Sequence, residues 1–182
     1  MYFLFICMIY YFHVRCYMKL YVKQKVFSWV DRFYIKDEEG VDRYYVEGQL
    51  FSWGKKLRVY DMANQEIAFI QQKVFSFLPK FYVFKSDVQI AEIVKEFTFF
   101  KPRYSIVGLN WTIIGDFWSH EYQINENDQP IVRISKHWFT WGDSYELDIL
   151  NDKDVDLALA VVLAIDAVMS AGRNAASHTS HQ

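Results

Sequence analysis

Cysteine is nearly absent from this 182-residue chain and is confined to its start. The only two cysteines, Cys7 and Cys16, lie in the first 17 residues. From Met18 onward the chain therefore has no disulfide framework and no thiolate metal site, which suits a reducing compartment and predicts a cytoplasmic protein. The net charge of −2 at pH 7 gives no general attraction to nucleic acid, so no nucleic-acid partner is expected.

The first 17 residues lack the parts of a signal peptide. Met1–Phe12 is almost wholly apolar, but no basic segment precedes it and no small-residue cleavage site follows it. The segment is also short for a membrane span. We expect translation to begin at Met18, with residues 1–17 an extension. The alternative is a short membrane anchor.

A single long apolar stretch, Val155–Ala171, lies near the end of the chain. Its apolar residues occupy every face of a helical wheel, so a helix here must be buried all round, in lipid or in protein. A length of about 26 Å is marginal for a bilayer, and Asp166 argues against lipid. We predict a helix over 155–171 inside a protein shell, ended by Gly172 in a left-handed cap, with a disordered tail over 173–182. Its expected core residues are Leu157, Leu159, Val162, Leu163, Ile165, Asp166, Val168 and Met169.

An aromatic motif recurs along the chain at intervals of 24 residues. Its copies are Phe27-Ser28-Trp29, Phe51-Ser52-Trp53, Phe75-Ser76-Phe77, Phe99-Phe100-Lys101 and, after a gap of 40, Phe139-Thr140-Trp141. The long gap leaves room for a degenerate copy near Gly115-Asp116-Phe117. Turn-forming residues follow each copy, so each unit predicts two strands and six units predict about twelve.

Alternating strands with frequent turns are typical of a barrel or a sandwich. A closed barrel leaves no exposed strand edges, and a barrel of this size needs a filler, which the apolar helix supplies. The alternatives are a β-propeller, which needs about four strands per unit, and a sandwich with an outer helix, which needs a polar helix face. We predict an all-β fold, an approximately twelve-stranded β-barrel that encloses the C-terminal helix in one domain over residues 18–172.

Several of these features resemble one family. The opening segment 18–29, the repeated Phe-Ser-Trp motif, Tyr44–Gly48 and the terminal apolar helix are similar to bacterial LURP-one-related (YxjI-like) proteins, over Met18 to about Arg173. The resemblance implies the Tubby C-terminal-like fold, a twelve-stranded barrel threaded by a hydrophobic helix and shared with the phospholipid scramblases. The family has no settled activity. Better understood proteins of this fold bind phosphoinositides or act at membranes, an analogy of fold alone. Val30, where a glycine would suit the first turn, and the apolar leader depart from the family pattern.

Catalytic and metal sites find little support in the sequence. Ser119, His120 and Glu121 are adjacent, so on a strand they would point to opposite faces, and we expect them on a polar barrel rim. We therefore predict no enzyme and no cofactor. Asp148, Asn151, Asp152, Asp154 and Asp156 precede the helix but lack the pattern of a calcium loop. We expect them to cap the helix and to favour its positive end, with Asp152, Asp154 and Asp156 as weak metal candidates only.

The most promising binding residues are basic. Equivalent turns of an up-and-down barrel lie at one end, so the cations of the first four units would share one rim, beside Trp29 and Trp53. These cations are Arg32, Lys55, Lys56, Lys80, Lys101 and Arg103. We expect a non-enzymatic binding or scaffold module whose basic rim meets anionic phospholipid headgroups or an acidic protein, in the cytoplasm or at the inner face of the membrane. The alternatives are a small-ligand carrier or enzyme that uses a polar pocket, and a scramblase-like membrane role. Asp166 is expected to contact a polar strand residue or a cation at the barrel mouth.

Overall fold

The computed structural model describes residues 18–23, 32–49, 53–99, 101–117, 119–137, 144–150 and 155–179, without the side chains of Lys23, His137 and 174–179. These residues form twelve strands and one helix, α2. The strands are β1 (Met18–Lys23), β2 (Arg32–Lys36), β3 (Asp42–Gln49), β4 (Lys56–Asp61), β5 (Glu66–Gln72), β6 (Lys80–Lys85), β7 (Val88–Lys95), β8 (Tyr104–Val107), β9 (Trp111–Asp116), β10 (Glu121–Glu126), β11 (Gln129–His137) and β12 (Ser144–Ile149), and α2 covers Val155–Thr179.

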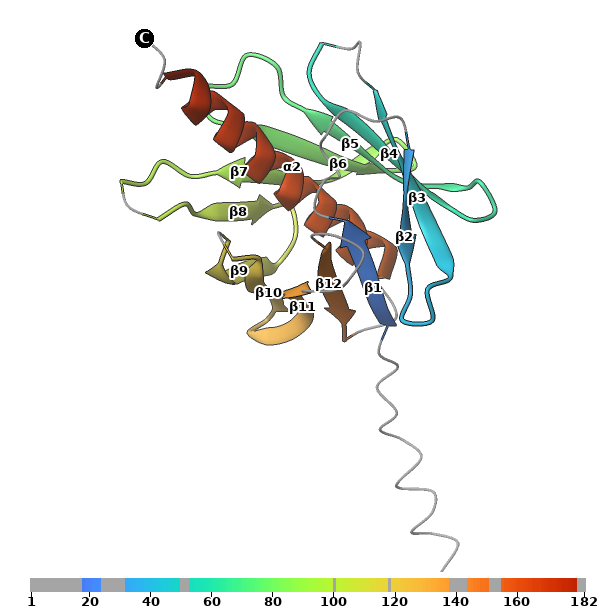
Figure 1. Ribbon diagram of the computed structural model, residues 1–182. Coiled ribbons are helices and arrows are strands. Elements are labelled where there is room, and N and C mark those ends of the chain that lie inside the picture. Colours follow the sequence, from blue (N-terminus) through green and yellow to red (C-terminus); the bar gives the residue numbers. More distant parts are fainter. Residues whose placement is uncertain are drawn as a thin grey trace, which may run out of the picture.

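The strands form one antiparallel sheet that curves round α2 (Figure 1). Its order is β8-β7-β6-β5-β4-β3-β2-β1-β12-β11-β10-β9, so every strand pairs with its neighbours in sequence except β8 with β9, and β1 joins β12. In β4, for example, Leu57 and Val59 are buried while Lys56 and Arg58 lie on the outer face, as the two-residue period of a strand requires. The predicted helix-filled barrel is therefore confirmed.

The barrel closes without a hydrogen-bonded ladder between β8 and β9, the two ends of the sheet order. A three-residue connection with Gly108 at φ +98° joins these strands. On the other side of the seam the rings of Tyr104 and Phe117 lie 4.7 Å apart, and Phe117 also contacts Tyr122. Aromatic packing thus covers the seam, where the sequence had predicted a fully paired shell.

Recurrent backbone features follow the spacing of the aromatic motif. The register shifts at Ile35, Val59 and Val83, positions 24 residues apart. Asp37 and Asp61 follow two of these bulges, and the side chain of each accepts hydrogen bonds from the backbone N–H groups two and four residues on. Such bulges increase strand twist, which helps the sheet to curl round the helix.

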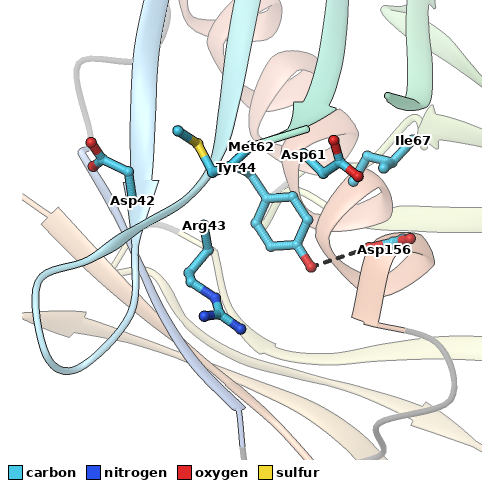
Figure 2. A pocket seen from close by; sticks show the side chains of 7 residues that line it. All are labelled: Asp42, Arg43, Tyr44, Asp61, Met62, Ile67 and Asp156. Atoms are coloured by element: carbon cyan, nitrogen blue, oxygen red, sulfur yellow. Dashed lines mark hydrogen bonds between the residues drawn. The ribbon is translucent and has the colours of Figure 1, made fainter. Parts of the chain in front are cut away.

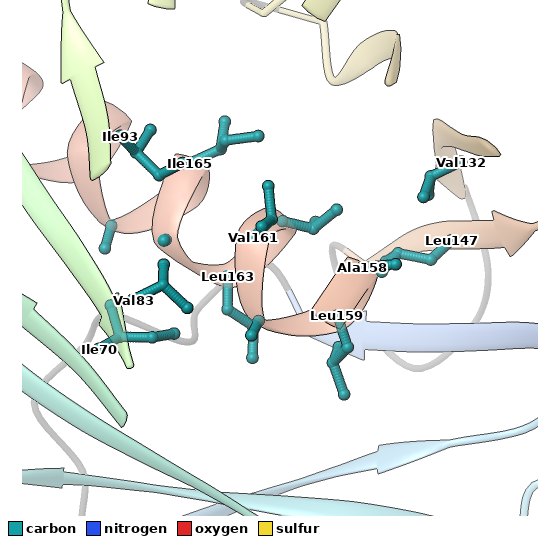
Figure 3. Packing of buried hydrophobic residues seen from close by; sticks show 14 of the residues in the cluster. Ile70, Val83, Ile93, Val132, Leu147, Ala158, Leu159, Val161, Leu163 and Ile165 are labelled. Atoms are coloured by element: carbon teal, nitrogen blue, oxygen red, sulfur yellow. The ribbon is translucent and has the colours of Figure 1, made fainter. Parts of the chain in front are cut away.

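The core lies between α2 and the inner faces of the strands. Every residue of α2 from Ala158 to Ser170 is buried. Figure 3 shows Leu163 and Ile165 near Ile70, Val83 and Ile93 of β5, β6 and β7. The other end of the helix lies towards Leu147 and Val132 in the same view. All the predicted core residues of the helix are buried except Leu157, which is partly buried.

The predicted end of the helix is wrong. α2 continues to Thr179, and Gly172 does not have the positive φ of a left-handed cap. Gly172 instead allows a close approach, because a Cβ at this position would lie 3.1 Å from Nζ of Lys95. By length and composition, Val155–Arg173 could cross a membrane, with a mean hydropathy of 2.0, but 72% of this stretch is buried inside the barrel.

A cavity inside α2 should destabilise the whole domain. Leu163 is fully buried, so Leu163→Ala removes packed methyl groups and should lower the free energy of unfolding by about 3 kcal/mol. The exposed Val88→Ala on β7 should change it by less than about 0.5 kcal/mol. Urea unfolding followed by circular dichroism measures both. Equal effects of the two changes would contradict the central place of the helix.

Candidate functional site

The two ends of the barrel differ in their loops. Strands β2, β4, β6 and β8 begin at one end, which also holds the β3–β4, β5–β6, β7–β8 and β9–β10 connections. The last turns of α2 lie at this end (Figure 1), and a Cβ on Gly172 would lie 3.1 Å from Nζ of Lys95 at the end of β7. We call it the helix-exit end. The other end holds the tight hairpins and the start of α2, and we call it the hairpin end.

All six predicted cations lie at the helix-exit end, as expected from an up-and-down order. Two of them form ion pairs with glutamates of neighbouring strands. Arg32 pairs with Glu47 of β3 and lies 4.6 Å from the ring of Tyr45, and Nζ of Lys80 lies 3.0 Å from Glu92 of β7. Both side chains therefore lie along the outer wall, and paired exposed charges of this kind attract a distant anion weakly.

Lys55 lies deeper than its neighbours, half-buried at the mouth of the barrel. Burial lowers the pKa of its ammonium group, and the nearby charge of Arg173 at the end of α2 lowers it further. Arg173 also counteracts the rise that burial causes in the pKa of Tyr104. Lys95 lies close to the same part of α2, beside Gly172, so Lys55, Lys95 and Arg173 gather at the mouth of the barrel.

Lys56, Lys101 and Arg103 remain as outward-facing cations. Lys101 and Arg103 are exposed on the β7–β8 connection and Lys56 is half-exposed at the start of β4. No carboxylate in the described part of the chain lies within ion-pair distance of any of the three. We call these three residues the basic rim.

Exposed aromatic side chains accompany the basic rim, a feature that the sequence analysis missed apart from Trp53. They come from three successive connections of the helix-exit end, and they belong to the 24-residue motif or adjoin it. They are Trp53 (80% exposed), Phe75 (92%), Phe77 (93%), Phe97 (66%) and Phe99 (86%). We call them the aromatic tips.

The hairpin end is acidic. Its turns and strand ends carry Asp37, Glu38, Glu39, Asp42, Asp61, Glu66, Asp87, Asp128 and Asp156, against Lys36, Arg43 and Lys85. The barrel is thus charged with opposite signs at its two ends, which turns the helix-exit end towards any anionic surface.

A pocket of about 320 Å³ opens at the hairpin end beside the start of α2 (Figure 2). It is lined by Asp42, Arg43, Tyr44, Asp61, Met62, Ile67 and Asp156. The hydroxyl of Tyr44 donates a hydrogen bond of 3.1 Å to Oδ1 of Asp156. Burial, and then the charge of Asp156, raises the pKa of Tyr44, so the phenol stays a donor and ties β3 to the first turn of the helix.

The acidic cluster before the helix divides in the structure. Asp156 lies in the first turn of α2 and accepts the hydrogen bond from Tyr44. Asp148 lies on β12, opposite Lys19 and Arg133 of the flanking strands. Asn151, Asp152 and Asp154 lie outside the described residues. Within the described ranges no group of three or more histidine, cysteine or acidic side chains could hold a metal ion.

Asp166, in the middle of α2, contacts two side chains of the barrel wall. Its Oδ1 lies 3.5 Å from Nε2 of His120, and its Oδ2 accepts from the hydroxyl of Tyr145 at 3.5 Å. Tyr145 is the polar strand residue that was expected. His120 was expected on a polar rim, but only 4% of it is exposed, and its ring stacks on Tyr145 at 5.6 Å. His120 lies in the connection between β9 and β10 with a left-handed backbone, φ +58°, so the strand alternation assumed from the sequence does not apply to it.

These features define a Tubby C-terminal-like protein, a twelve-stranded barrel that holds one apolar helix. The fold matches the X-ray structure of an Arabidopsis thaliana protein, AT5G01750, with a TM-score of 0.58, over 84% of this chain and 91% of that one, at 14% identity. The family model LURP-one-related matches residues 18–166. The chain is also 37% identical over 152 residues to the uncharacterized protein YxjI of Bacillus subtilis (strain 168), which covers 84% of this chain and 94% of the relative. The chain therefore belongs to the LURP-one-related family.

The contact between Asp166 and His120 should contribute strongly to stability. His120→Ala removes a buried ring that stacks on Tyr145 and contacts Asp166, so the free energy of unfolding should fall by about 2–3 kcal/mol. Asp166→Asn removes the charge and keeps an acceptor, and should cost about 1 kcal/mol. Glu121→Gln, an exposed change in the next position, is the control. Urea unfolding at neutral pH gives the three values, and a His120→Ala effect no larger than that of Glu121→Gln would contradict the assignment.

Buried tyrosines should make the domain sensitive to alkali. Burial and the charge of Asp166 raise the pKa of Tyr122 and Tyr145 well above the ordinary value, so the native state keeps these protons at a pH where the unfolded chain loses them, above about 10. The native state then binds more protons than the unfolded state, and stability falls as pH rises.

Tyr122→Phe removes one such proton. It should make the loss of unfolding free energy above about pH 10 shallower by up to about 1.4 kcal/mol per pH unit. Urea titrations between pH 8 and pH 11 measure the slope. An unchanged slope would show that Tyr122 keeps no proton in the native state beyond pH 10.

Proposed function

We propose that this protein is a non-enzymatic binding module that engages anionic phospholipid headgroups through the basic rim. The observation that carries the proposal is the placement of Lys56, Lys101 and Arg103 at one end of the barrel, without acidic partners among the described residues. The hydrogen-bonding capacity of their side chains is thus open to phosphate groups. The proposed location is the cytoplasm, with peripheral attachment to the inner face of the membrane.

The charge pattern supports a membrane surface as the ligand. Each Lys or Arg near an anionic bilayer contributes about 1 kcal/mol of attraction, and three of them on one rim act together. The acidic hairpin end is repelled by the same surface, so attraction and repulsion favour one orientation. Arg32 and Lys80 contribute less than the sequence analysis expected, because Glu47 and Glu92 neutralise them.

The interior of the barrel disfavours a carrier or an enzyme. α2 fills the space in which other barrels hold a ligand. The pocket at the hairpin end, at about 320 Å³, is at the small end of the range for ligand sites, about 300–1,000 Å³. No histidine, serine or cysteine is among the residues that line it. Its carboxylates suit a small cationic ligand, so a carrier of such a ligand is the alternative that this pocket favours.

Charge reversal on the basic rim should weaken the binding of anionic vesicles. We expect the full chain to float with vesicles that contain phosphatidylserine or a phosphoinositide at low salt, and to bind neutral vesicles less. Lys56→Glu with Lys101→Glu and Arg103→Glu should weaken the low-salt binding about 100-fold. High salt should weaken the wild-type interaction as well, because it screens exposed charges.

A matched control changes the net charge equally at the other end of the barrel. Lys36→Glu with Arg43→Glu and Lys85→Glu alters three cations of the hairpin end and should retain most of the binding. Equal losses in both triple variants would mean that net charge alone matters and would overturn the proposed rim. Absence of binding to every vesicle would reject the lipid proposal and favour an acidic protein as the partner.

A further inference from the structure

We propose that the aromatic tips insert into the headgroup region of the membrane and so hold the barrel upright on the bilayer. This inference rests on the proposed function, because it concerns the same end of the molecule. It adds a second, apolar mode of attachment. The basic rim would contact phosphates, and the rings of the aromatic tips would lie below them.

The aromatic tips are largely exposed to solvent. Single exposed apolar side chains are normal, but a group of large ones on one face marks an interaction surface. Five aromatic side chains here are exposed by between 66% and 93%, and they come from three neighbouring connections. Leaving so much apolar area in water is unfavourable, so a partner that covers these rings gains free energy.

The connections that carry the tips are held together at their bases. Backbone hydrogen bonds continue the sheet up to the foot of each one, and they leave only the aromatic segments beyond. The bonds run from Gln72 N to Lys55 O (2.8 Å), from Lys73 N to Lys80 O (2.9 Å), from Lys95 N to Pro79 O (3.2 Å) and from Glu96 N to Arg103 O (2.9 Å). The bases of the connections are thus held by the sheet, which brings the aromatic tips to the same end of the barrel.

Neighbouring connections that carry the aromatic tips are also in contact with one another. Gly54 has φ +84°, and a Cβ there would lie 3.2 Å from both the backbone oxygen of Gln72 and Cγ2 of Val74. The β3–β4 and β5–β6 connections are therefore in contact. Within the β7–β8 connection the rings of Phe97 and Phe99 lie 5.2 Å apart, edge to face. Phe75 adopts φ +60°, a strained conformation for a bulky residue, and nine-tenths of its side chain projects into solvent.

The residues next to the rings identify the partner. Lys73 precedes Phe75 in the chain, and Lys101 and Arg103 follow Phe99. Aromatic rings beside long basic side chains suit the membrane interface, where the rings lie at headgroup depth and the cations reach the phosphates. A second copy of this chain fits less well, because a symmetric contact through this end would place Lys56, Lys101 and Arg103 against the same cations.

The experiment measures membrane binding that salt does not remove. The full chain with Phe75→Ser and Phe77→Ser is compared with wild type on vesicles of phosphatidylserine and phosphatidylcholine, at low and high salt. We expect wild type to keep a salt-resistant fraction and the variant to lose it, with a partition coefficient lower by about tenfold or more. Both changes are on exposed side chains, so the thermal unfolding midpoint should stay unchanged.

Depth is measured separately through Trp53. Lipids brominated in the upper acyl chain should quench part of the tryptophan fluorescence of wild type, and Trp53→Phe should remove that part. The control for the phenylalanine pair is Met62→Ser with Val88→Ser, two exposed apolar residues of the hairpin end. This control should bind and quench like wild type.

The outcomes separate the two proposals. If the charge-reversed rim weakens binding while the phenylalanine variant binds and quenches like wild type, the headgroup proposal holds and insertion is wrong. If wild type binds no anionic vesicle, both proposals fail. If the phenylalanine change alters only the sedimentation of the protein, from dimer to monomer, the rings pack between two copies and insertion is wrong. Binding by residues 1–17 alone would leave every variant like wild type, which also overturns the inference.

Discussion

The need to enclose α2 governs the architecture. From Ala158 to Ser170 the helix has no exposed face, and a helix that is apolar all round requires partners on every side. A single open sheet covers one face, so the sheet has to curl until its two ends, β8 and β9, meet. At 25 residues the helix is about 37 Å long, longer than the strands that surround it. Its last turns therefore emerge at one end and make the two ends of the barrel unequal.

The two ends of the barrel also differ in charge. Asp156 lies in the first turn of α2 and accepts a hydrogen bond from Tyr44. Near the other end of α2, Arg173 lies close to Lys55, and Gly172 lies close to Lys95. Negative charge in the first turn is favourable at the positive end of the helix dipole. The cations near Gly172 lie more than one turn before the end of α2 at Thr179, so they mark the mouth of the barrel. The two ends of the barrel thus differ in charge as well as in shape.

The sequence predicted what depends on local pattern and missed what depends on tertiary contact. Alternation and the 24-residue motif predicted the strands and the common end of their turns, and the motif spacing matches the bulges at Ile35, Val59 and Val83. The helix end was placed too early because Gly172 serves its contact with Lys95, a residue far away in the chain. The ion pairs of Arg32 with Glu47 and of Lys80 with Glu92 depend on which residues lie next to each other on neighbouring strands, and the sequence analysis considered each cation on its own strand only. Phe75 and Phe77 have the spacing of a core strand, and only the end of the ladder at Gln72 exposes them.

The filled interior also leaves little room for a ligand inside the barrel. A ligand inside would have to displace side chains such as Leu159 and Leu163, which are fully buried, and so would unfold the domain. The outer wall carries ion pairs such as Arg58 with Glu66 and Lys80 with Glu92, which satisfy its charges internally. The two ends of the barrel remain as candidate binding surfaces. The hairpin end offers acid and one small pocket, whereas the helix-exit end combines exposed rings with outward cations. Among the described residues, the helix-exit end combines positive charge with exposed apolar area, so the proposed lipid attachment and the proposed orientation of the barrel rest on one surface.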